Sequence, residues 1–274
     1  MDEAIGMGVF NITFTGGDPM LRKDIYSLIS HVRDTGRAIS TMFTPGVRLA
    51  GRAAQLKDAG LYSVYVILSN VSPEKHDEMV GTPGTFELAV RGIRECIDSG
   101  ILTGIATYVT RERLNDGTID QLIDFAGELG VHEVLLSDPL PTGKMLRNEQ
   151  FILDKAERER LVAMQKDYNT RPKGTKIFTN SCVKGPTGVG CVAGNKWVHV
   201  TAVGEVSPCD YTPLSFGNVK NGGLAPVWNR IQRHATYSRH SDECRIQDYA
   251  FRRRYIDRIP EGAVLPYPID RVES

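Results

Sequence analysis

The chain has 274 residues, of which 41% are hydrophobic and 24% are charged, so it can bury a large core. Lys and Arg together number 33, as do Asp and Glu, so no net charge favours nucleic acid or an anionic membrane as a partner. No apolar run approaches the length of a membrane span, and the first residues lack the layout of a signal peptide. The composition therefore predicts an ordinary globular, cytoplasmic protein whose function must be inferred from its sites.

The first half of the chain alternates between strand and helix patterns. A β-branched and aromatic run over Val9–Thr15 predicts a strand that ends at a pair of glycines. Apolar residues at helical spacing then predict a helix closed by Gly36. Further strands are predicted over 38–43, 61–68, 101–109 and 133–136, and further helices over 49–59, 86–97 and 119–129. About five βα units are therefore predicted, and they build a parallel sheet covered by helices.

The loops that follow the predicted strands share a distinctive composition. They contain TGGDP, FTPG, LSNVSPEKHD, VTRERLND and SDPLPTGK, and they hold much of the glycine, proline and small polar residues of this half. Parallel sheets bind ligands at the edge where their strands end, because these loops meet there. An active site is therefore predicted at this edge.

The alternation stops after a long polar helix predicted over 154–168. The stretch NTRPKGTK breaks the pattern, and we place a domain boundary near Arg171, between residues 1–170 and 171–274. Beyond it, WVHVTAV followed by the pair Gly204-Glu205 predicts a β-hairpin, and a short helix is predicted over 224–231. The second part is therefore predicted to be a small α+β domain.

The five cysteines are unevenly distributed along the chain. Cys96 stands alone on an apolar helical face, where a free cysteine behaves as a small core hydrophobe. The others all lie in the final third, at Cys182, Cys191, Cys209 and Cys244. The predicted hairpin turn lies between the second and third of these, so it brings two thiols to its base. Clustered thiolates suit an iron–sulfur cluster or an all-cysteine zinc site, and four unrelated cysteines are the alternative to either. The close C-x-x-C pairs of zinc ribbons are absent.

The turn FTGGDP, residues 14–19, suggests what the sheet edge binds. Two glycines leave the backbone open to a ligand, although a simple tight turn has the same composition. A phosphate site fits poorly, because Asp18 brings a negative charge and the Lys-Ser/Thr pair of a P-loop is absent. A carboxylate beside open backbone suits a cation such as an ammonium group. The turn is therefore a candidate site for the α-amine of an amino acid.

Two series of motifs resemble a known enzyme family. FTGGDPMLRKDI resembles the GGEP motif of radical S-adenosylmethionine (SAM) enzymes, and the spacing C-x12-G-x4-C, with SPC and FGNV, resembles their SPASM/twitch auxiliary-cluster extension. The likeness covers nearly the whole chain, from GVFNITFTGGDPMLRKDI through YVILSN and HDEMVGTPGTFE to PCDYTPLSFGNV and VWNRI. It implies an α/β fold: a partial (β/α)6 TIM-like barrel from which the first βα unit is missing, with a small α+β auxiliary-cluster domain after it.

The resemblance also implies roles for residues of this chain. The turn Gly16-Gly17-Asp18-Pro19 is expected to meet the methionine amine of SAM, with Asp in place of the more frequent Glu of the family. Ser69 falls where relatives contact the SAM ribose or carboxylate, although the next residue departs from their usual Asp-Gly continuation. One auxiliary [4Fe–4S] cluster is expected on the four late cysteines, because the further C-x2-C-x5-C-x3-C run of a full SPASM domain is absent.

The family holds its catalytic [4Fe–4S] cluster on a C-x3-C-x2-C loop, and this chain has no cysteine before Cys96. The resemblance therefore indicates either a fragment with a late start codon or a degenerate paralogue, and we favour the fragment. In complete family members a reduced cluster cleaves SAM to a 5′-deoxyadenosyl radical, which abstracts hydrogen from a peptide or cofactor-precursor substrate. Flavodoxin or ferredoxin is the expected electron donor. The truncated chain is expected to be inactive, and the alternative function is a non-catalytic module that binds an iron–sulfur cluster or zinc and recognises a partner.

Two smaller features have simple structural explanations. His76 and Asp77, in HDEMVGTPG, are expected to order the loop after a strand rather than to form an acid–base pair. The run FRRRY, residues 251–255, is expected to be a solvated helix face rather than a nucleic-acid patch, because the protein is neutral overall.

Overall fold

The computed structural model of the chain describes residues 1–183, 185 and 188–274. Two compact units interleave in the sequence: residues 1–137 with 160–179, and residues 138–159 with 180–274. The predicted boundary at residue 171 falls inside the first unit, between helix α8 (Lys155–Thr170) and strand β6 (Lys176–Thr179). Strand β6 belongs to the first unit because it pairs in parallel with β5 (Glu133–Ser137), which satisfies its backbone groups.

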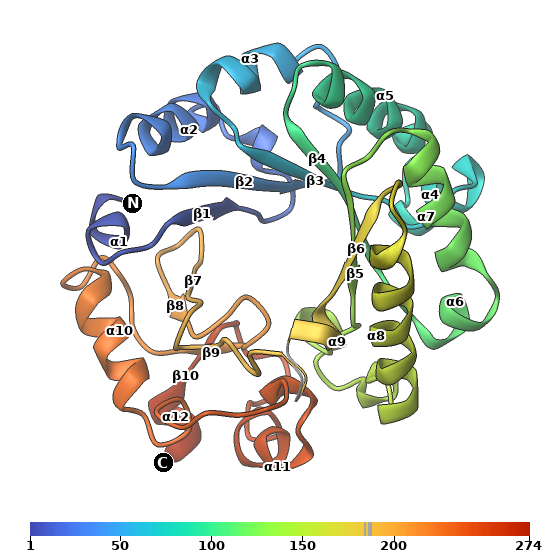
Figure 1. Cartoon of the computed structure of the whole chain (residues 1–274). Helices are drawn as coiled ribbons and strands as arrows, with labels where there is room; N and C mark the ends of the chain where they lie inside the picture. The colour runs from blue at the N-terminus through green and yellow to red at the C-terminus, as the bar shows by residue number, and fades with distance from the viewer. Residues whose placement is uncertain (184, 186–187) are drawn as a thin grey trace. The chain divides into compact units, whose positions relative to one another are not determined.

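The first unit is built on one parallel sheet of six strands, ordered β1 to β6 (Figure 1). The four strands that precede β5 are β1 (Asn11–Phe14), β2 (Ile39–Thr44), β3 (Ser63–Ile67) and β4 (Leu102–Tyr108). Each pairs in parallel with the next, so all their carboxyl ends lie at one edge. The predicted parallel α/β architecture is confirmed, and a sixth strand follows the five that the sequence pattern indicates.

Helices lie on the outer side of this sheet (Figure 1). Those with an apolar face turned to the sheet are α2 (Ile25–Asp34), α3 (Ala53–Ala59), α5 (Thr85–Asp98) and α7 (Thr118–Glu128). Each buries an apolar stripe; on α5, Ile93 is fully buried and Phe86 is 5% exposed. Burying one such side chain contributes about 1.5–3 kcal/mol. Cys96 lies on the same face at 0% exposure, and burial raises the pKa of its thiol to about 12, which confirms the predicted core role.

Some short helices of the first unit carry no apolar stripe, and the sequence pattern missed them. They are α1 (Asp2–Gly6), α4 (Pro73–Val80) and α6 (Arg111–Asn115), with the 3-10 turn η1 (Pro19–Leu21). Helix α4 starts by capping: the Ser72 hydroxyl accepts a hydrogen bond from Lys75 N over 3.3 Å, and proline follows the cap. No helix among the described residues is both long and apolar enough to cross a membrane.

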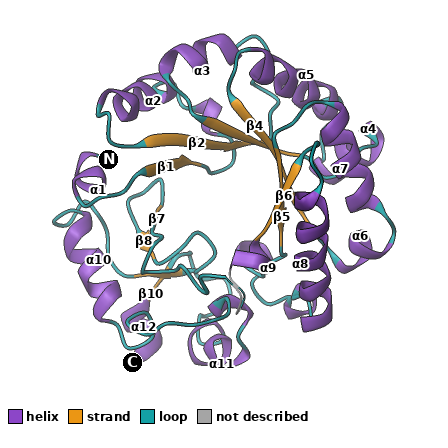
Figure 2. Cartoon of the chain, in the orientation of Figure 1, coloured by secondary structure: helices purple, strands orange, loops and turns teal. Residues whose placement is uncertain are grey.

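The second unit consists mainly of loops and turns with short elements among them (Figure 2). Strands β7 (His199–Val200) and β8 (Val206–Ser207) form the predicted antiparallel hairpin, with Gly204 at φ +95° in its turn. Strands β9 (Leu214–Ser215) and β10 (Tyr267–Pro268) form a parallel pair. The helices are α9 (Asn180–Val183), α10 (Leu224–Arg233), α11 (Tyr249–Phe251) and α12 (Ile269–Glu273), with a π-helical turn over Arg252–Ile256. The remaining 3-10 turns are η2 (Gly143–Met145), η3 (Glu149–Phe151) and η4 (Arg245–Gln247).

A buried arginine ties residues 138–159 to the rest of the second unit. Arg252 is 1% exposed, and its guanidinium donates to Glu149 Oε1 over 2.8 Å and to Leu146 O over 2.6 Å. A third bond reaches Ile246 O over 3.3 Å, so the buried charge is well satisfied. The expectation that FRRRY forms a solvated face is therefore wrong for Arg252. It is wrong for Phe251 and Tyr255 as well, which are 6% and 2% exposed, and it holds for Arg253 and Arg254, which are exposed.

Candidate functional site

The turn after β1 holds a buried carboxylate. Gly16 has φ +134°, which favours glycine, and a Cβ there would meet no atom within 4 Å, so the space beside the turn is open. Asp18 Oδ1 accepts hydrogen bonds from Met20 N over 3.1 Å and from Thr44 Oγ1 over 2.8 Å. The Asp18 side chain is 8% exposed, yet its Oδ2 has no hydrogen-bond partner among the described residues. Arg48 Nε lies 3.7 Å from this oxygen, outside hydrogen-bond distance.

The two oxygens of Asp18 therefore differ in what they do. Oδ1 caps η1 and ties the turn to Thr44, at the end of β2, so it explains the local structure. Oδ2 has no such role, and a buried carboxylate oxygen without a hydrogen bond is destabilising until a donor reaches it. A cationic donor gives the strongest such bond. The geometry of the turn suits an ammonium group.

Ser69 begins the loop that follows β3, at the same edge of the sheet. Its backbone N–H donates to Nδ1 of His76 over 3.1 Å. His76 is 1% exposed and burial lowers its pKa, so its ring is a neutral acceptor near neutral pH. Because β2 alone separates β1 from β3, the strands that lead to Asp18 and Ser69 lie roughly 10 Å apart by the usual strand spacing.

Asp77 orders the start of the next helix. Its carboxylate accepts hydrogen bonds from Phe86 N over 2.9 Å, from the Thr85 hydroxyl over 2.8 Å and from Gly84 N over 2.5 Å. These bonds, that of Phe86 first, lower the pKa of Asp77. The predicted loop-ordering role of His76 and Asp77 is confirmed, since each receives backbone N–H groups that flank α4.

The buried ring of His76 makes stability sensitive to acid. Between the ordinary histidine pKa of about 6.5 and the lower folded value, the unfolded chain binds a proton that the folded chain resists, so stability falls as pH falls. One such histidine changes the free energy of unfolding by at most about 1.4 kcal/mol per pH unit. Solvent screening makes the actual change smaller. We expect His76→Asn, which keeps an acceptor, to flatten this slope in urea unfolding between about pH 7.5 and about pH 5.5.

His199 provides the matched comparison, because burial lowers its pKa as well. His199→Asn should also reduce the slope of the free energy of unfolding against pH. In the double variant, the two reductions should add. Identical slopes in wild type and His76→Asn would contradict the assignment.

Three of the late cysteines lie on segments that backbone hydrogen bonds hold together. Cys191 N donates to Ser241 O over 2.8 Å, which ties it to the loop that leads to Cys244. Gly194 N donates over 2.9 Å to the carbonyl of the residue before Cys209. Exposure is 5% at Cys191 and 6% at Cys244. The hairpin therefore brings two thiol segments together as predicted, and the 240s loop adds a third.

Cys182 lies on α9, at the start of the glycine-rich loop that leads to Cys191. Val189 N donates to Val183 O over 2.9 Å, so the two cysteines flank a closed loop. Within this loop, residues 184, 186 and 187 lie outside the described residues. Where the structure describes the chain, no three His, Cys, Asp or Glu side chains are grouped as one metal ion requires.

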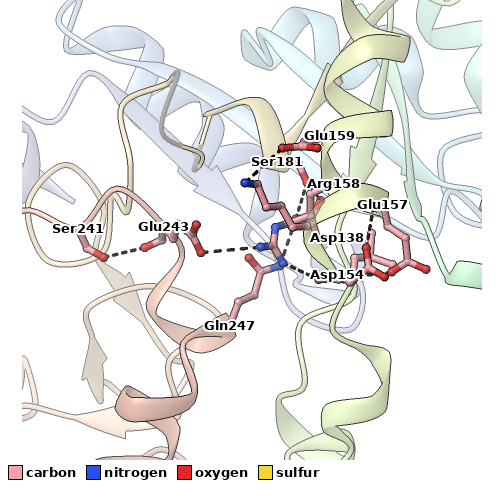
Figure 3. A network of polar contacts seen from close by, with 11 residues as sticks. Asp138, Asp154, Glu157, Arg158, Glu159, Ser181, Ser241, Glu243 and Gln247 are labelled. Carbon is pink, nitrogen blue, oxygen red and sulfur yellow. Dashed lines mark hydrogen bonds and ion pairs between the residues drawn. The ribbon is translucent and has the colours of Figure 1, made fainter.

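A buried carboxylate anchors the segments of the first and last of these cysteines (Figure 3). Asp138 is 3% exposed, and the Ser181 hydroxyl lies 2.8 Å from each of its oxygens. Gln247 Nε2 also donates to Asp138 Oδ2 over 3.2 Å. Ser181 directly precedes Cys182, and Gln247 lies on the turn that follows Cys244. Asp138 therefore holds the side chains of one residue beside Cys182 and one residue three positions after Cys244. Its place in SDPLPTGK did not reveal this role.

A second arm of the same network reaches the residue before Cys244. Arg158 Nη2 lies 3.8 Å from Glu243 Oε2, and the Ser241 hydroxyl donates to Glu243 O over 2.9 Å (Figure 3). Arg158 also donates to Leu153 O. Side chains of residues 138–159 thus contact and hold the loop that carries Cys244.

A hollow of about 380 Å³ opens at the opposite edge of the sheet, where strands begin. Its lining includes Lys57, Tyr62, Leu102 and His132. None of the predicted site residues lines it. The predicted sites are instead at the carboxyl edge of the sheet and in the second unit.

Comparison with known proteins identifies both parts of the chain. Residues 1–126 match the family model of the radical SAM superfamily, and residues 191–248 match the SPASM iron-sulfur cluster-binding domain. The chain carries a radical SAM domain and a SPASM domain. Its radical SAM and SPASM domains imply [4Fe–4S] clusters and SAM as cofactors.

Several relatives are similar to this chain over most of its length. An AdoMet-dependent heme synthase of Nitratidesulfovibrio vulgaris is 27% identical over 269 residues, which cover 87% of this chain and 71% of the relative. PqqA peptide cyclase of Xanthomonas campestris pv. campestris is 26% identical over 255 residues, which cover 86% of this chain and 65% of the relative. The crystal structure of Streptococcus suis SuiB bound to precursor peptide SuiA matches with TM-score 0.68 and 16% identity, over 86% of this chain and 57% of that one. The likeness to SuiB shows the fold alone.

Proposed function

We propose that this protein is a radical SAM oxidoreductase or maturase that acts on a peptide or a cofactor precursor. The observation that carries the proposal is the presence of a radical SAM domain and a SPASM domain in one chain. Similarity to a heme synthase and to a peptide cyclase supports these two substrate classes. Bound beside a reduced catalytic cluster, SAM would supply the 5′-deoxyadenosyl radical chemistry for hydrogen abstraction from the substrate. Flavodoxin or ferredoxin is the proposed electron donor.

The two functions divide along the chain. The matched ranges, 1–126 and 191–248, lie on opposite sides of residue 171, which supports a SAM-binding part within 1–170 and a cluster-binding part within 171–274. Strand β6 and residues 138–159 complicate this simple division, because each packs with the part on the other side.

In the proposed SAM site, the turn Gly16-Gly17-Asp18-Pro19 receives the methionine end of the cofactor. Asp18 Oδ2, which has an ion pair with Arg48 but no hydrogen bond, would accept a hydrogen bond from the ammonium group. The open space beside Gly16 leaves room for the ligand, and Pro19 starts the turn that Asp18 caps. Ser69, whose N–H is held by His76, contacts the ribose or carboxylate of SAM from the loop after β3.

In the proposed cluster site, Cys182, Cys191, Cys209 and Cys244 are the thiolate ligands of one auxiliary [4Fe–4S] cluster. The backbone bonds from Cys191 and Gly194, and the anchoring of neighbouring residues by Asp138, support this set. The burial of Cys191 and Cys244 also fits a cluster that is shielded from water. These residues bind and position the cluster, and they exclude solvent from it.

The 274 residues contain no C-x3-C-x2-C segment for a catalytic cluster. We therefore propose that this chain by itself binds SAM and the auxiliary cluster but does not cleave SAM. Anaerobic reconstitution with iron and sulfide should give a brown protein with about four iron and about four sulfide per chain. Addition of dithionite and SAM should yield no 5′-deoxyadenosine. A colourless protein that holds zinc instead would contradict the proposal.

A second candidate is a non-catalytic module that keeps one metal centre and recognises a partner. One feature favours it, since no cysteine precedes Cys96. The two candidates differ in SAM binding: the enzyme proposal requires that SAM binds at the Asp18 turn, and the module does not. Equilibrium dialysis with labelled SAM separates them.

A further inference from the structure

The hydroxyl of Tyr237 is a buried polar group without a hydrogen bond. Tyr237 is 4% exposed, and its oxygen has no hydrogen-bond partner among the described residues. Buried hydroxyls are nearly always paired, because an unpaired one loses its hydration without compensation. A folded protein that keeps such a group in its core is expected to pair it with something else, such as a bound cofactor.

Packing holds the Tyr237 ring in one place. The Phe216 ring lies 5.5 Å from it and the Phe251 ring 6.5 Å, both edge-to-face. Gly194 completes the slot, since a Cβ at this glycine would approach Tyr237 Cδ1 to 3.2 Å. Gly194 lies on the same loop as Cys191, so the ring packs directly against a segment that carries a proposed ligand.

The surroundings of the hydroxyl are sulfur-rich. The Cys209 and Cys191 thiols lie close enough to act electrostatically on the Tyr237 hydroxyl. A tyrosine O–H keeps its proton near neutral pH. The Thr212 hydroxyl lies 3.1 Å from Cys209 Sγ and is also near the Tyr237 hydroxyl. The Arg245 guanidinium lies 5.6 Å from the centre of the Tyr237 ring, and Arg245 directly follows Cys244.

We propose that Tyr237 donates its O–H to a sulfur atom of the auxiliary cluster, either a sulfide or a ligating thiolate, and thereby raises the reduction potential of the cluster. The inference rests on the proposed function, because it requires a cluster at the four cysteines. A hydrogen bond to sulfur stabilises the reduced, more negative state more than the oxidised state, and such bonds tune cluster potentials. Tyr237 contacts the cluster in this scheme and touches no substrate.

Tyr237→Phe removes the donor and keeps the ring. In the reconstituted full chain we expect unchanged iron content and a more negative midpoint potential in an EPR-monitored redox titration. The midpoint should shift by ~59 mV, which for a one-electron couple is about a tenfold change in the ratio of reduced to oxidised cluster at a fixed potential. Without the cluster, this variant should melt no lower than wild type, because it loses only an unpaired hydroxyl.

Tyr255→Phe is the matched control. Tyr255 is 2% exposed and lies in the same aromatic cluster, 5.0 Å from Phe251, but its hydroxyl is paired with Thr236 Oγ1 over 2.6 Å. We therefore expect the opposite result: a lower melting temperature and an unchanged midpoint potential.

A second measurement tests the bond in the wild-type protein. Electron–nuclear double resonance of the reduced cluster should detect one strongly coupled proton that exchanges in heavy water and is missing in Tyr237→Phe. Full iron content with an unchanged midpoint in Tyr237→Phe, or no exchangeable coupled proton in wild type, would overturn the inference alone. If Tyr237→Phe fails to fold or load iron, the wild-type proton signal decides. A wild-type chain that takes up no iron would overturn the proposed function as well.

Discussion

Replacing Cys191 with alanine should lower the iron content of the reconstituted chain from about four per chain to less than about one. Cys191 is the proposed ligand that connects the others, because its loop is bonded to the backbone beside Cys209 and to Ser241 before Cys244. Loss of a thiolate leaves an iron without its protein ligand in a buried setting. Iron analysis and the visible absorption of the anaerobic protein measure the effect.

Cys96→Ala is the control for this experiment. Cys96 is fully buried on α5, and burial raises the pKa of its thiol to about 12, so it is a poor ligand and a packing residue. This variant should lose stability by the small amount typical of one buried atom while it keeps its iron. If Cys191→Ala keeps four iron per chain, or Cys96→Ala loses them, the ligand assignment is wrong.

Replacing Asp18 with asparagine should weaken SAM binding by about 10- to 150-fold, the range that a charged hydrogen bond of about 1.5–3 kcal/mol implies. The amide is nearly isosteric, and its oxygen accepts the bonds that Oδ1 receives from Met20 N and Thr44 Oγ1. The NH2 group then takes the place of Oδ2, so it presents a donor to the ammonium of SAM. Equilibrium dialysis with labelled SAM gives the affinity.

Two controls separate this effect from damage to the turn. 5′-Methylthioadenosine has the nucleoside part of SAM but lacks the α-amino group of methionine. Its affinity should therefore be the same for wild type and Asp18→Asn. Asp24→Asn removes an exposed carboxylate that is paired with Arg22 over 2.9 and 2.7 Å, and it should leave SAM affinity unchanged. Equal weakening of both ligands in Asp18→Asn would show that the turn is disturbed as a whole, and wild-type SAM affinity would refute the ammonium contact.

Elements with strong local patterns could be predicted from the sequence. Strands β1 to β5 and helices α2, α5 and α7 carry apolar residues at the spacing of their own secondary structure, and each was found close to its predicted range. The hairpin around Gly204 was predicted from turn chemistry, and the core position of Cys96 from its apolar helix. Helices α4 and α6 escaped prediction, because their starts depend on the caps Ser72 and Thr110 and not on an apolar stripe.

The candidate sites were predictable only where function leaves a local motif. The glycine turn with Asp18 and the spacing of the late cysteines are visible in the sequence, but the unpaired Oδ2 is a property of its folded surroundings. Asp138, Arg252 and Tyr237 carry no local signal for their roles. A buried carboxylate, a buried guanidinium and an unpaired hydroxyl become recognisable only when distant residues are seen to surround them.

The sequence by itself determined the alternation of strands and helices, the order of the glycine turn at residues 16–19 and the late cysteines, and the family that these motifs resemble. These features depend on local periodicity and on residue types at fixed spacing, which the chain carries in one dimension. The tertiary structure alone decided that β6 joins the sheet across a long helix, and that residues 138–159 pack with the loop of Cys244. Such contacts join residues from 43 positions apart (Glu133 and Lys176) to 109 positions apart (Asp138 and Gln247). Burial, hydrogen-bond satisfaction and charge compensation among these residues exist only once the chain has folded.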